Sequence, residues 1–311
     1  AQSMPDQGAV RESLQAAEFV VLQEAYGNTD TAAYADLMLP ATSWGEKEGT
    51  VTNSERRITH VSPAVGGPGE ARHDWEIVVE FARRLGQKLD NSLTEHLFPY
   101  ECIEDIFNEH RETTRGRDLD ITGLSYAILD TAGPQQWPYP EAASEGRQRL
   151  YEDGVFATSN GRARFVPVKH QATAEKASDA YPLSLISGRL RDQWHGMSRT
   201  GTVAHLFNLD EAPEISLHPT DMHARGLEAG DLVRVSNPRG DVVIRVMPGE
   251  TLLPGCAWMP MHWGSQFMNS AGVNALTISA TDPYSQQPEL KHTTVAVEKV
   301  DLPWQLVILR K

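Results

Sequence analysis

The sequence of 311 residues predicts an α/β region, then a mixed, mainly helical segment, and then a closed β-barrel. Three observations carry this prediction. An apolar strand, a short helix and a second strand alternate near the amino end, which is typical of a parallel α/β layer. Apolar residues next recur at helical spacing. Short alternating strands separated by turn residues follow, and a barrel is the arrangement that leaves such strands no exposed edge.

Residues 1–70 form the predicted α/β region. EFVVLQEAY, which starts at residue 18, predicts the first strand, and DTAAYADLMLPA predicts the short helix and the next strand. The Gly/Pro stretch SPAVGGPGEA must form a loop. We expect these residues to be the end of an α/β domain.

Residues 71–180 form the predicted helical segment. The apolar residues of HDWEIVVEFARRLGQ have helical spacing, and Gly86 is the expected stop. PYECIEDIFNEHRETT predicts a second helix. FATSNGRARFVPV predicts a hairpin, because SNG supplies turn residues at its centre.

Residues 181–301 form the predicted barrel, and residues 302–311 a tail. The apolar run YPLSLI predicts a strand that ends in a glycine turn, and LVRVSN, DVVIRV and CAWMPM predict further strands. HPTDMHARGLEAGD predicts a short helix between strands that ends at Gly226.

Composition limits the class of protein. Hydrophobic residues make up 40% and charged residues 23%, as in ordinary globular proteins, and the formal net charge is −14. Such a charge argues against nucleic acid or an anionic membrane as the main partner. The two cysteines, Cys102 and Cys256, exclude a disulfide framework and cannot hold an iron–sulfur cluster alone.

The compartment and the extent of the chain are also expectations from the sequence. No run approaches transmembrane length, and the amino end lacks a signal-peptide pattern. With so few cysteines, we expect a cytoplasmic protein with no membrane contact. The chain starts without Met and without an obvious domain beginning, so we expect part of a longer polypeptide.

The stretch SGRLRDQWHGMSRTG, residues 187–201, is the densest group of binding side chains. It combines three arginines with Trp194 and His195 directly after a predicted strand. Guanidinium groups recognise phosphates and fused polar rings, and the two aromatic rings add stacking faces. The alternative is a solvated, charged turn. Because Trp194 has no packing reason to lie between a Gln and a His, we favour a site for an anionic ligand.

Other polar segments allow a structural reading beside the functional one. GEKEGT places Lys47 near a glycine, or is an exposed charged loop, and Asp74 opens a predicted helix, as an N-terminal acid would. Asn274 and Lys291 border a loop rich in hydroxyls, or belong to ordinary turns. His262 and Trp263 follow a barrel strand, where a structural His is common. No Ser–His–Asp order and no H-E-x-x-H motif supports a hydrolase.

Taken in order, six segments resemble the carboxyl-terminal part of molybdopterin oxidoreductases of the dimethyl-sulfoxide-reductase family. The resemblance is strongest to bacterial assimilatory nitrate reductases, which share the compact His195–Arg199 turn. It implies molybdenum held by two pterin guanine dinucleotides, and a six-stranded, double-psi-like dinucleotide-binding barrel after the remnant of an α/β nucleotide-binding domain. The segments are YADLMLPATSWGEKEGTVTNSERRI, HDWEIVVEFARRLG, NGRARF, SGRLRDQWHGMSRTG, PMHW and VNALTISATDPYSQQPELK.

The resemblance also implies roles for residues. Lys47 and Asp74 would contact a guanosine, and Gln23 and Glu24 match a Ser–Asp nucleotide pair, although Glu is longer than the usual Asp. Asn274 and Lys291 would contact a pterin, and His262 and Trp263 would line a substrate funnel. The implied cofactor loop consists of Ser187, Gly188, Arg189, Leu190, Arg191, Asp192, Gln193, Trp194, His195 and Gly196.

The implied reaction is the two-electron reduction of nitrate to nitrite. Formate dehydrogenase is the alternative within the family, and a non-catalytic barrel module that binds a nucleotide or a partner is the alternative outside it. The family's iron–sulfur motif and its molybdenum-ligating cysteine are absent here, so the rest of the same polypeptide would supply them, and the electron donor stays open. We therefore expect the isolated chain to contain no molybdenum and to reduce no nitrate.

Overall fold

The structure is a computed structural model that describes residues 1–90, 92, 94–207, 212–268 and 270–302. It divides into two compact units, each with its own hydrophobic core. The first unit contains Ala1–Leu22, Tyr26–Met38 and His170–Lys311, and the second contains Gln23–Ala25 and Leu39–Lys169. Among the described residues, no helix combines the length and the apolar character that a membrane crossing requires.

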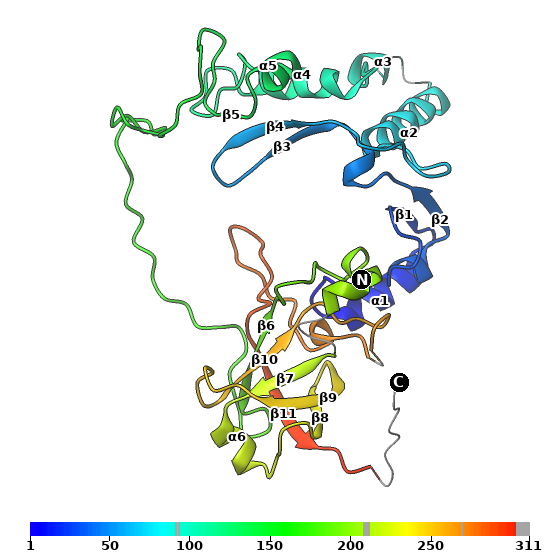
Figure 1. Ribbon diagram of the computed structural model, residues 1–311, viewed down its shortest axis with the longest axis vertical. Helices are drawn as coiled ribbons and strands as arrows, with labels where there is room; N and C mark the ends of the chain where they lie inside the picture. Colours follow the sequence, from blue (N-terminus) through cyan, green and yellow to red (C-terminus); the bar gives the residue numbers. More distant parts are fainter. Residues whose placement is uncertain (91, 93, 208–211, 269, 303–311) are drawn as a thin grey trace. The chain divides into compact units, whose positions relative to one another are not determined.

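The first unit is built around a closed six-stranded barrel, which confirms the predicted fold (Figure 1). The strand order around the barrel is β10-β6-β11-β8-β9-β7. Along β6 and β8 alternate residues are buried, because successive side chains of a strand point to opposite faces. The strands are β6 (Leu183–Gly188), β7 (Glu214–Leu217), β8 (Leu232–Asn237), β9 (Gly240–Pro248), β10 (Cys256–Pro260) and β11 (Thr293–Lys299).

The pairing of β6 with β10 determines where the loops of the barrel meet. These two strands run parallel, with Gly188 opposite Pro260. Parallel neighbours end at the same edge, so the segments that follow Gly188 and Pro260 start side by side. β11 pairs with β6 in the antiparallel sense from Thr293 onward, which brings the residues just before it to the same edge.

Shorter elements complete the first unit. β1 and β2 form a two-stranded sheet along which the chain passes from one unit to the other. In α6 a proline occupies the first turn, and Gly226 follows with φ 62°, as the sequence predicted for the helix end. The bounds are α1 (Gln7–Ala16), β1 (Val21–Glu24), η1 (Ala32–Tyr34), β2 (Leu37–Pro40), η3 (Thr200–Thr202), η4 (Ala204–Phe207), α6 (Pro219–Ala224) and η5 (Val273–Ala275).

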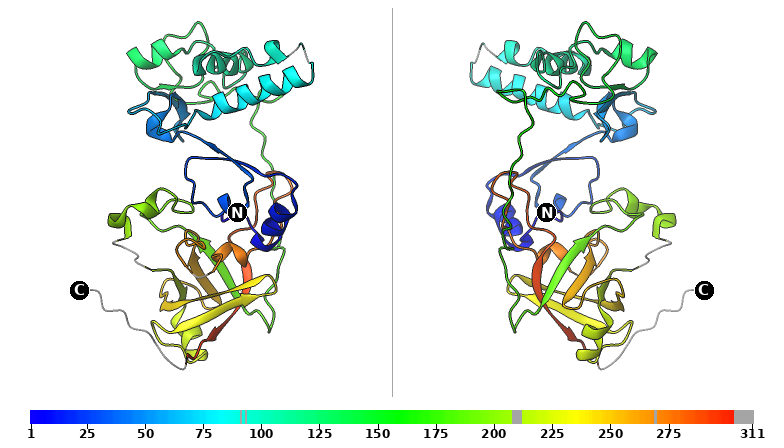
Figure 2. Two further views of the ribbon diagram at one scale, coloured as in Figure 1. Left: turned by 90° about the vertical axis from the view of Figure 1, so that its right-hand side faces the viewer. Right: turned by 90° about the vertical axis from the view of Figure 1, so that its left-hand side faces the viewer.

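The second unit packs helices on one side of a small antiparallel sheet, as Figures 1 and 2 both show. Ile58 of the sheet, Phe107 and Leu129 of the helices and the loop residue Leu124 share one core. The elements are η2 (Trp44–Glu46), β3 (Gly49–Thr52), β4 (Arg57–Val61), α2 (Asp74–Lys88), α3 (Thr94–Leu97), α4 (Ile103–Thr113), α5 (Tyr126–Thr131) and β5 (Gln135–Gln136).

Two local predictions are wrong. Gly86 does not stop α2, which continues to Lys88; instead Gly86 is buried, and a Cβ there would lie 2.0 Å from Thr94 Oγ1. The predicted hairpin over FATSNGRARFVPV is only a turn, in which the Phe156 N–H donates to the Gly161 carbonyl at 2.9 Å. Its second arm contains Pro167, which cannot donate to a strand partner, and Phe165 is 93% exposed.

Candidate functional site

The carboxyl end of β6 is anchored in the barrel of the first unit. The Ser187 hydroxyl donates to the Leu290 carbonyl at 2.5 Å, and Lys291 Nζ donates to the Ser187 carbonyl at 2.6 Å. Gly188 lies against the indole of Trp258, since an added Cβ would be 2.0 Å from the indole Nε1. The following loop therefore leaves the barrel from a fixed point.

An exposed aromatic and cationic face begins at this point. The guanidinium carbon of Arg189 lies 4.8 Å from the centroid of the Trp194 ring, and His195 meets that ring edge-on at 4.7 Å. Trp194 is 48% exposed, so the face is open to a ligand. Burial, and then the charges of Arg189 and Arg199, lower the pKa of His195. At neutral pH the positive charge of this face therefore comes from the arginines.

Buried hydrogen bonds hold the middle of the loop against the rest of the first unit. Gln193 is buried; its amide donates to the Leu206 carbonyl at 3.1 Å and accepts from the Thr200 hydroxyl at 2.7 Å. Arg191, in contrast, has an exposed side chain whose Nε is 3.8 Å from an Asp192 oxygen. Within the loop, Gln193 thus has structural contacts, while Arg191 faces solvent.

His262 and Asn274 lie under the same loop. His262 is fully buried and hydrogen bonds to the backbone of Leu190 and His195. Asn274, also buried, donates to the Gln2 carbonyl at 3.0 Å, and the Gln2 amide donates to the His262 carbonyl at 2.6 Å. The two predicted residues are thus joined through Gln2, which the sequence did not single out.

Trp263, the neighbour of His262, is 3% exposed, and its ring lies 6.4 Å from the ring of Phe267. The first unit therefore gathers most of the predicted positions at one edge of the barrel. These are Ser187, Gly188, Arg189, Leu190, Gln193, Trp194, His195, Gly196, His262, Trp263, Asn274 and Lys291.

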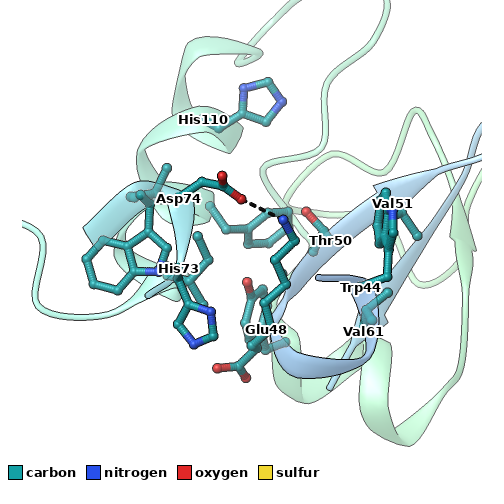
Figure 3. A pocket seen from close by; sticks show the side chains of 15 residues that line it. Trp44, Glu48, Thr50, Val51, Val61, His73, Asp74 and His110 are labelled. Atoms are coloured by element: carbon teal, nitrogen blue, oxygen red, sulfur yellow. Dashed lines mark hydrogen bonds and ion pairs between the residues drawn. The ribbon is translucent and has the colours of Figure 1, made fainter. Parts of the chain in front are cut away.

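The second unit contains the other predicted residues. Asp74, in the first turn of α2, lines a pocket (Figure 3). Its carboxylate accepts from Lys47 Nζ at 2.6 Å and from the Gln23 amide at 2.7 Å. Burial disfavours the carboxylate, but these hydrogen bonds outweigh it and hold the pKa of Asp74 below its usual range. Asp74 is therefore an ionised acceptor at neutral pH. The carboxylate of Glu24 instead accepts from the Ala25 N–H at 2.9 Å.

Lys47 and Asp74 border a pocket of about 370 Å³, within the range of ligand sites (Figure 3). The hydroxyl of Tyr126 in this pocket is buried and has no hydrogen-bond partner among the described residues. Burial, followed by nearby acidic groups, raises the pKa of Tyr126 to about 12, so the phenol keeps its proton as an unused donor. The other lining residues are Trp44, Glu48, Gly49, Thr50, Val51, Val61, His73, Trp75, Ile103, Ile106, Phe107 and His110.

A buried histidine supports the same pocket from the β4 side. His60 Nδ1 lies 2.7 Å from an Asp130 oxygen and Nε2 lies 3.1 Å from a Glu48 oxygen. The imidazole lies against the ring of Tyr126, tilted by 33°, with 3.9 Å between the ring centroids. Burial opposes its charge, but the two carboxylates outweigh burial and raise the pKa of His60. Neither His60 nor Tyr126 was foreseen, because SYAILD reads only as an apolar helical turn and ITHV only as a strand.

His60→Gln is expected to remove a pH-dependent contribution to the free energy of unfolding of the second unit. A His with a raised folded pKa stabilises the fold below its unfolded pKa of about 6.5, and this contribution is lost as the pH rises through the folded value. Because Glu48 and Asp130 are half exposed, the loss should be at most about 1 kcal/mol. Urea unfolding between pH 6 and 8 measures it, and His96→Gln, on α3, should behave as the unchanged protein. Equal slopes for all three proteins would contradict the prediction.

The residues that the structure describes include no group of three or more His, Cys, Asp or Glu side chains arranged to hold a metal ion. Each unit has its own set of groups suited to an organic ligand: the first offers arginines beside aromatic faces, and the second offers an ionised carboxylate beside a largely apolar pocket.

Known proteins match this chain along most of its length. Residues 1–84 match the family model of molybdopterin oxidoreductases, and residues 183–294 match that of the molybdopterin dinucleotide binding domain. A nitrate reductase of Klebsiella oxytoca is 39% identical over 95% of this chain and 34% of its own length. The alpha subunit of an F420-dependent formate dehydrogenase from Methanocaldococcus jannaschii is 35% identical over 96% of this chain and 42% of its own length.

A solved structure shares the fold. The acetylene hydratase of Pelobacter acetylenicus aligns with a TM-score of 0.70 and 19% identity, over 96% of this chain and 42% of the other. The chain spans about a third to two fifths of the length of the relatives named above. The matches to both family models, together with the nitrate reductase and formate dehydrogenase relatives, show that this chain belongs to the molybdopterin oxidoreductase family.

Proposed function

We propose that this chain forms part of a molybdenum-dependent nitrate reductase, in which it holds bis(molybdopterin guanine dinucleotide). The face made by Arg189, Trp194 and His195 at the anchored end of β6 carries this proposal. It lies within residues 183–294, the part that matches the dinucleotide-binding model. The division into residues 1–70, 71–180 and 181–301 remains our proposal, and the tail expected over residues 302–311 lies outside the described residues from residue 303 on.

The first unit fits a pterin and its pyrophosphate. Arg189 offers planar donors and a positive charge to phosphate oxygens, and Trp194 offers a stacking face. Lys291 is exposed and donates to the Ser187 carbonyl, so its ammonium can also meet an anionic group. The amide of Asn274 has a donor and an acceptor that suit the polar edge of a pterin, and in this structure it is buried and donates to the Gln2 carbonyl.

The second unit fits a guanosine. Asp74 is ionised and can accept from the N–H groups of a guanine edge, which adenine does not present in the same pattern. The buried Tyr126 hydroxyl is a donor without a partner among the described residues, beside the same carboxylate–ammonium pair. An unused buried donor is costly, and a ligand acceptor would remove that cost.

When bound, the cofactor would supply the two-electron oxygen-atom transfer from nitrate, while these residues bind and orient it. In the same proposal, the rest of the polypeptide supplies the iron–sulfur cluster and the metal ligand, an electron-donor protein or domain reduces the enzyme, and the compartment is the cytoplasm. Formate oxidation is the second candidate, because a formate dehydrogenase alpha subunit is 35% identical.

Asp74→Asn in the intact protein tests the proposal. The amide removes a charged acceptor worth about 1.5–3 kcal/mol, so guanine nucleotide affinity should fall about tenfold or more. The expected result is loss of bound molybdenum and of guanosine monophosphate released by acid. Asp105→Asn is the matched control, because Asp105 also lies in the first turn of a helix of the same unit.

Rates with nitrate and with formate, measured with artificial electron donors and acceptors, then separate the two candidates. We expect nitrate reduction in the intact protein and its loss in Asp74→Asn. A cofactor-loaded protein that oxidises formate and leaves nitrate unchanged would contradict the substrate assignment. A protein that carries no guanine nucleotide at all would leave only a non-catalytic barrel module.

A further inference from the structure

His262 is placed to control the conformation of the loop after β6. It follows β10 by two residues, and its side chain is 0% exposed. Nε2 lies 2.9 Å from the backbone N of Leu190, and Nδ1 lies 2.7 Å from the carbonyl oxygen of His195. One imidazole thus spans the loop from its second residue to its seventh, counted from Arg189.

The two backbone partners determine where the imidazole proton lies. The Leu190 N–H can only donate, so Nε2 must be an acceptor, and the His195 carbonyl can only accept, so Nδ1 must carry the hydrogen. The ring is therefore the neutral Nδ1–H tautomer. A second proton would have to sit on Nε2, where it would face the Leu190 N–H.

The backbone of His195 needs such support. Its φ is +46°, in the left-handed region that residues other than glycine seldom adopt, and the next residue but one, Met197, has φ +59°. The His195 carbonyl, held by His262, belongs to this turn. Arg189 and His195, whose side chains form the exposed face with Trp194, flank the span that His262 holds.

We propose that His262 is a positioning residue that holds the Arg189–His195 loop in its ligand-binding conformation by accepting from Leu190 and donating to His195. Its effect on the cofactor rests on the proposed function, whereas its effect on the loop backbone does not. The volume of the side chain alone does not account for this role, because Nε2 acts as a hydrogen-bond acceptor and Nδ1 as a donor.

The charged groups that face His262 strengthen the requirement for a neutral ring. Arg189 and His195, both from the loop, are the titratable neighbours that act on it. Burial lowers the pKa of His262, the bond to His195 partly offsets this, and Arg189 lowers it again. A lowered folded pKa makes the loop contacts fully present above the unfolded pKa of about 6.5 and weaker as the pH falls below it.

Paired substitutions separate the two nitrogens. In His262→Gln the side-chain oxygen can reach the Nε2 position and still accept from Leu190. In His262→Asn the amide nitrogen can reach the Nδ1 position and still donate to His195, but nothing accepts from Leu190. Hydrogen exchange on the intact protein, resolved to single amides, measures the protection of the Leu190 amide. This amide should be protected in the unchanged protein and in His262→Gln. In His262→Asn and His262→Ala it should exchange at least about tenfold faster than in the unchanged protein.

His218→Asn is the control, since His218 Nδ1 also accepts a backbone N–H, that of Thr220 at 3.1 Å, elsewhere in the same unit. It should leave the Leu190 amide unchanged. Equal exchange of that amide in Gln and Asn would overturn the proposal, because it would reduce His262 to bulk.

Cofactor content distinguishes this result from a failure of the proposed function. The intact protein could bind no guanine nucleotide while the Leu190 amide still exchanges faster in His262→Asn than in His262→Gln. In that case the loop assignment stands and only the cofactor assignment fails. If the nucleotide is bound and all variants protect Leu190 alike, the positioning role fails alone. With both correct, Asn and Ala also lose the nucleotide more readily than Gln does.

Discussion

Arg239→Ala is expected to destabilise the barrel of the first unit by about 3 kcal/mol, the cost of breaking a largely buried ion pair. Arg239 contacts both carboxylate oxygens of Glu175, at 2.9 and 3.0 Å, and both side chains are at most 20% exposed. Glu175 also accepts from the Thr294 N–H of β11 at 2.8 Å. Glu175 thereby fastens the segment before β6 to the barrel, and without Arg239 its charge is left partly buried.

The same pair predicts how the unit responds to acid. Burial opposes the charge of Glu175, but Arg239 and Thr294 outweigh it and lower its pKa from 4.5 to about 2. A lowered folded pKa stabilises the fold above the unfolded value, and the contribution disappears as the pH falls from about 4.5 to about 2. Glu175→Gln should therefore flatten the acid limb of the stability curve.

Urea unfolding measures the loss of stability in Arg239→Ala and the acid limb of the stability curve in Glu175→Gln. Hydrogen exchange of the β8 and β11 amides assigns these changes to the barrel. Arg234→Ala is the control, because Arg234 pairs with Asp241 at 3.4 Å but both side chains are more than half exposed. That pair should contribute at most about 1 kcal/mol. Equal losses of stability for Arg239→Ala and Arg234→Ala would contradict the buried contribution.

Gly188→Ala is expected to cost about 2–3 kcal/mol and to displace the loop that follows. The new Cβ would lie 2.0 Å from Trp258 Nε1 and 2.5 Å from Cε2, and a rigid indole cannot yield as the end of a flexible chain does. Because Gly188 pairs with Pro260 on the neighbouring strand, either β6 must move or the indole must turn. Either shift changes the start of the Arg189–His195 loop.

Thermal unfolding and the exchange rate of the Leu190 amide measure the effect of Gly188→Ala. The second change Trp258→Leu, which removes the indole, should restore much of the loss. Gly27→Ala serves as control, because nothing lies within 4 Å of its Cβ position. A Gly188→Ala protein with unchanged stability and unchanged Leu190 exchange would show that the close approach does not matter.

The sequence predicted the barrel because its evidence is periodic and local. Apolar and polar residues alternate along LVRVSN and DVVIRV, which indicates the buried face of each strand. The turn residues between these segments indicate that the strands are short. The loop after β6 was predictable for another reason: an exposed Trp among arginines has no packing role, and the structure leaves Trp194 48% exposed.

Contacts between distant residues could not be predicted in this way. His262 meets Leu190 and His195 only because β6 and β10 run parallel, and no local pattern states that pairing. Likewise Tyr126 reaches the Lys47 pocket from α5, far along the chain. Gly86 misled the prediction, since glycine marks both helix ends and close approaches, and only the position of Thr94 distinguishes them.

The measurement that tests the central claim most directly is the guanosine monophosphate released by acid from the intact protein, counted against its molybdenum by mass spectrometry. Bis(molybdopterin guanine dinucleotide) contains two guanosine monophosphate units, so we predict two of them for each molybdenum in the intact protein, and smaller amounts of both nucleotide and molybdenum in Asp74→Asn. An intact protein that contains molybdenum but releases adenosine or cytidine monophosphate, or no nucleotide, would contradict it.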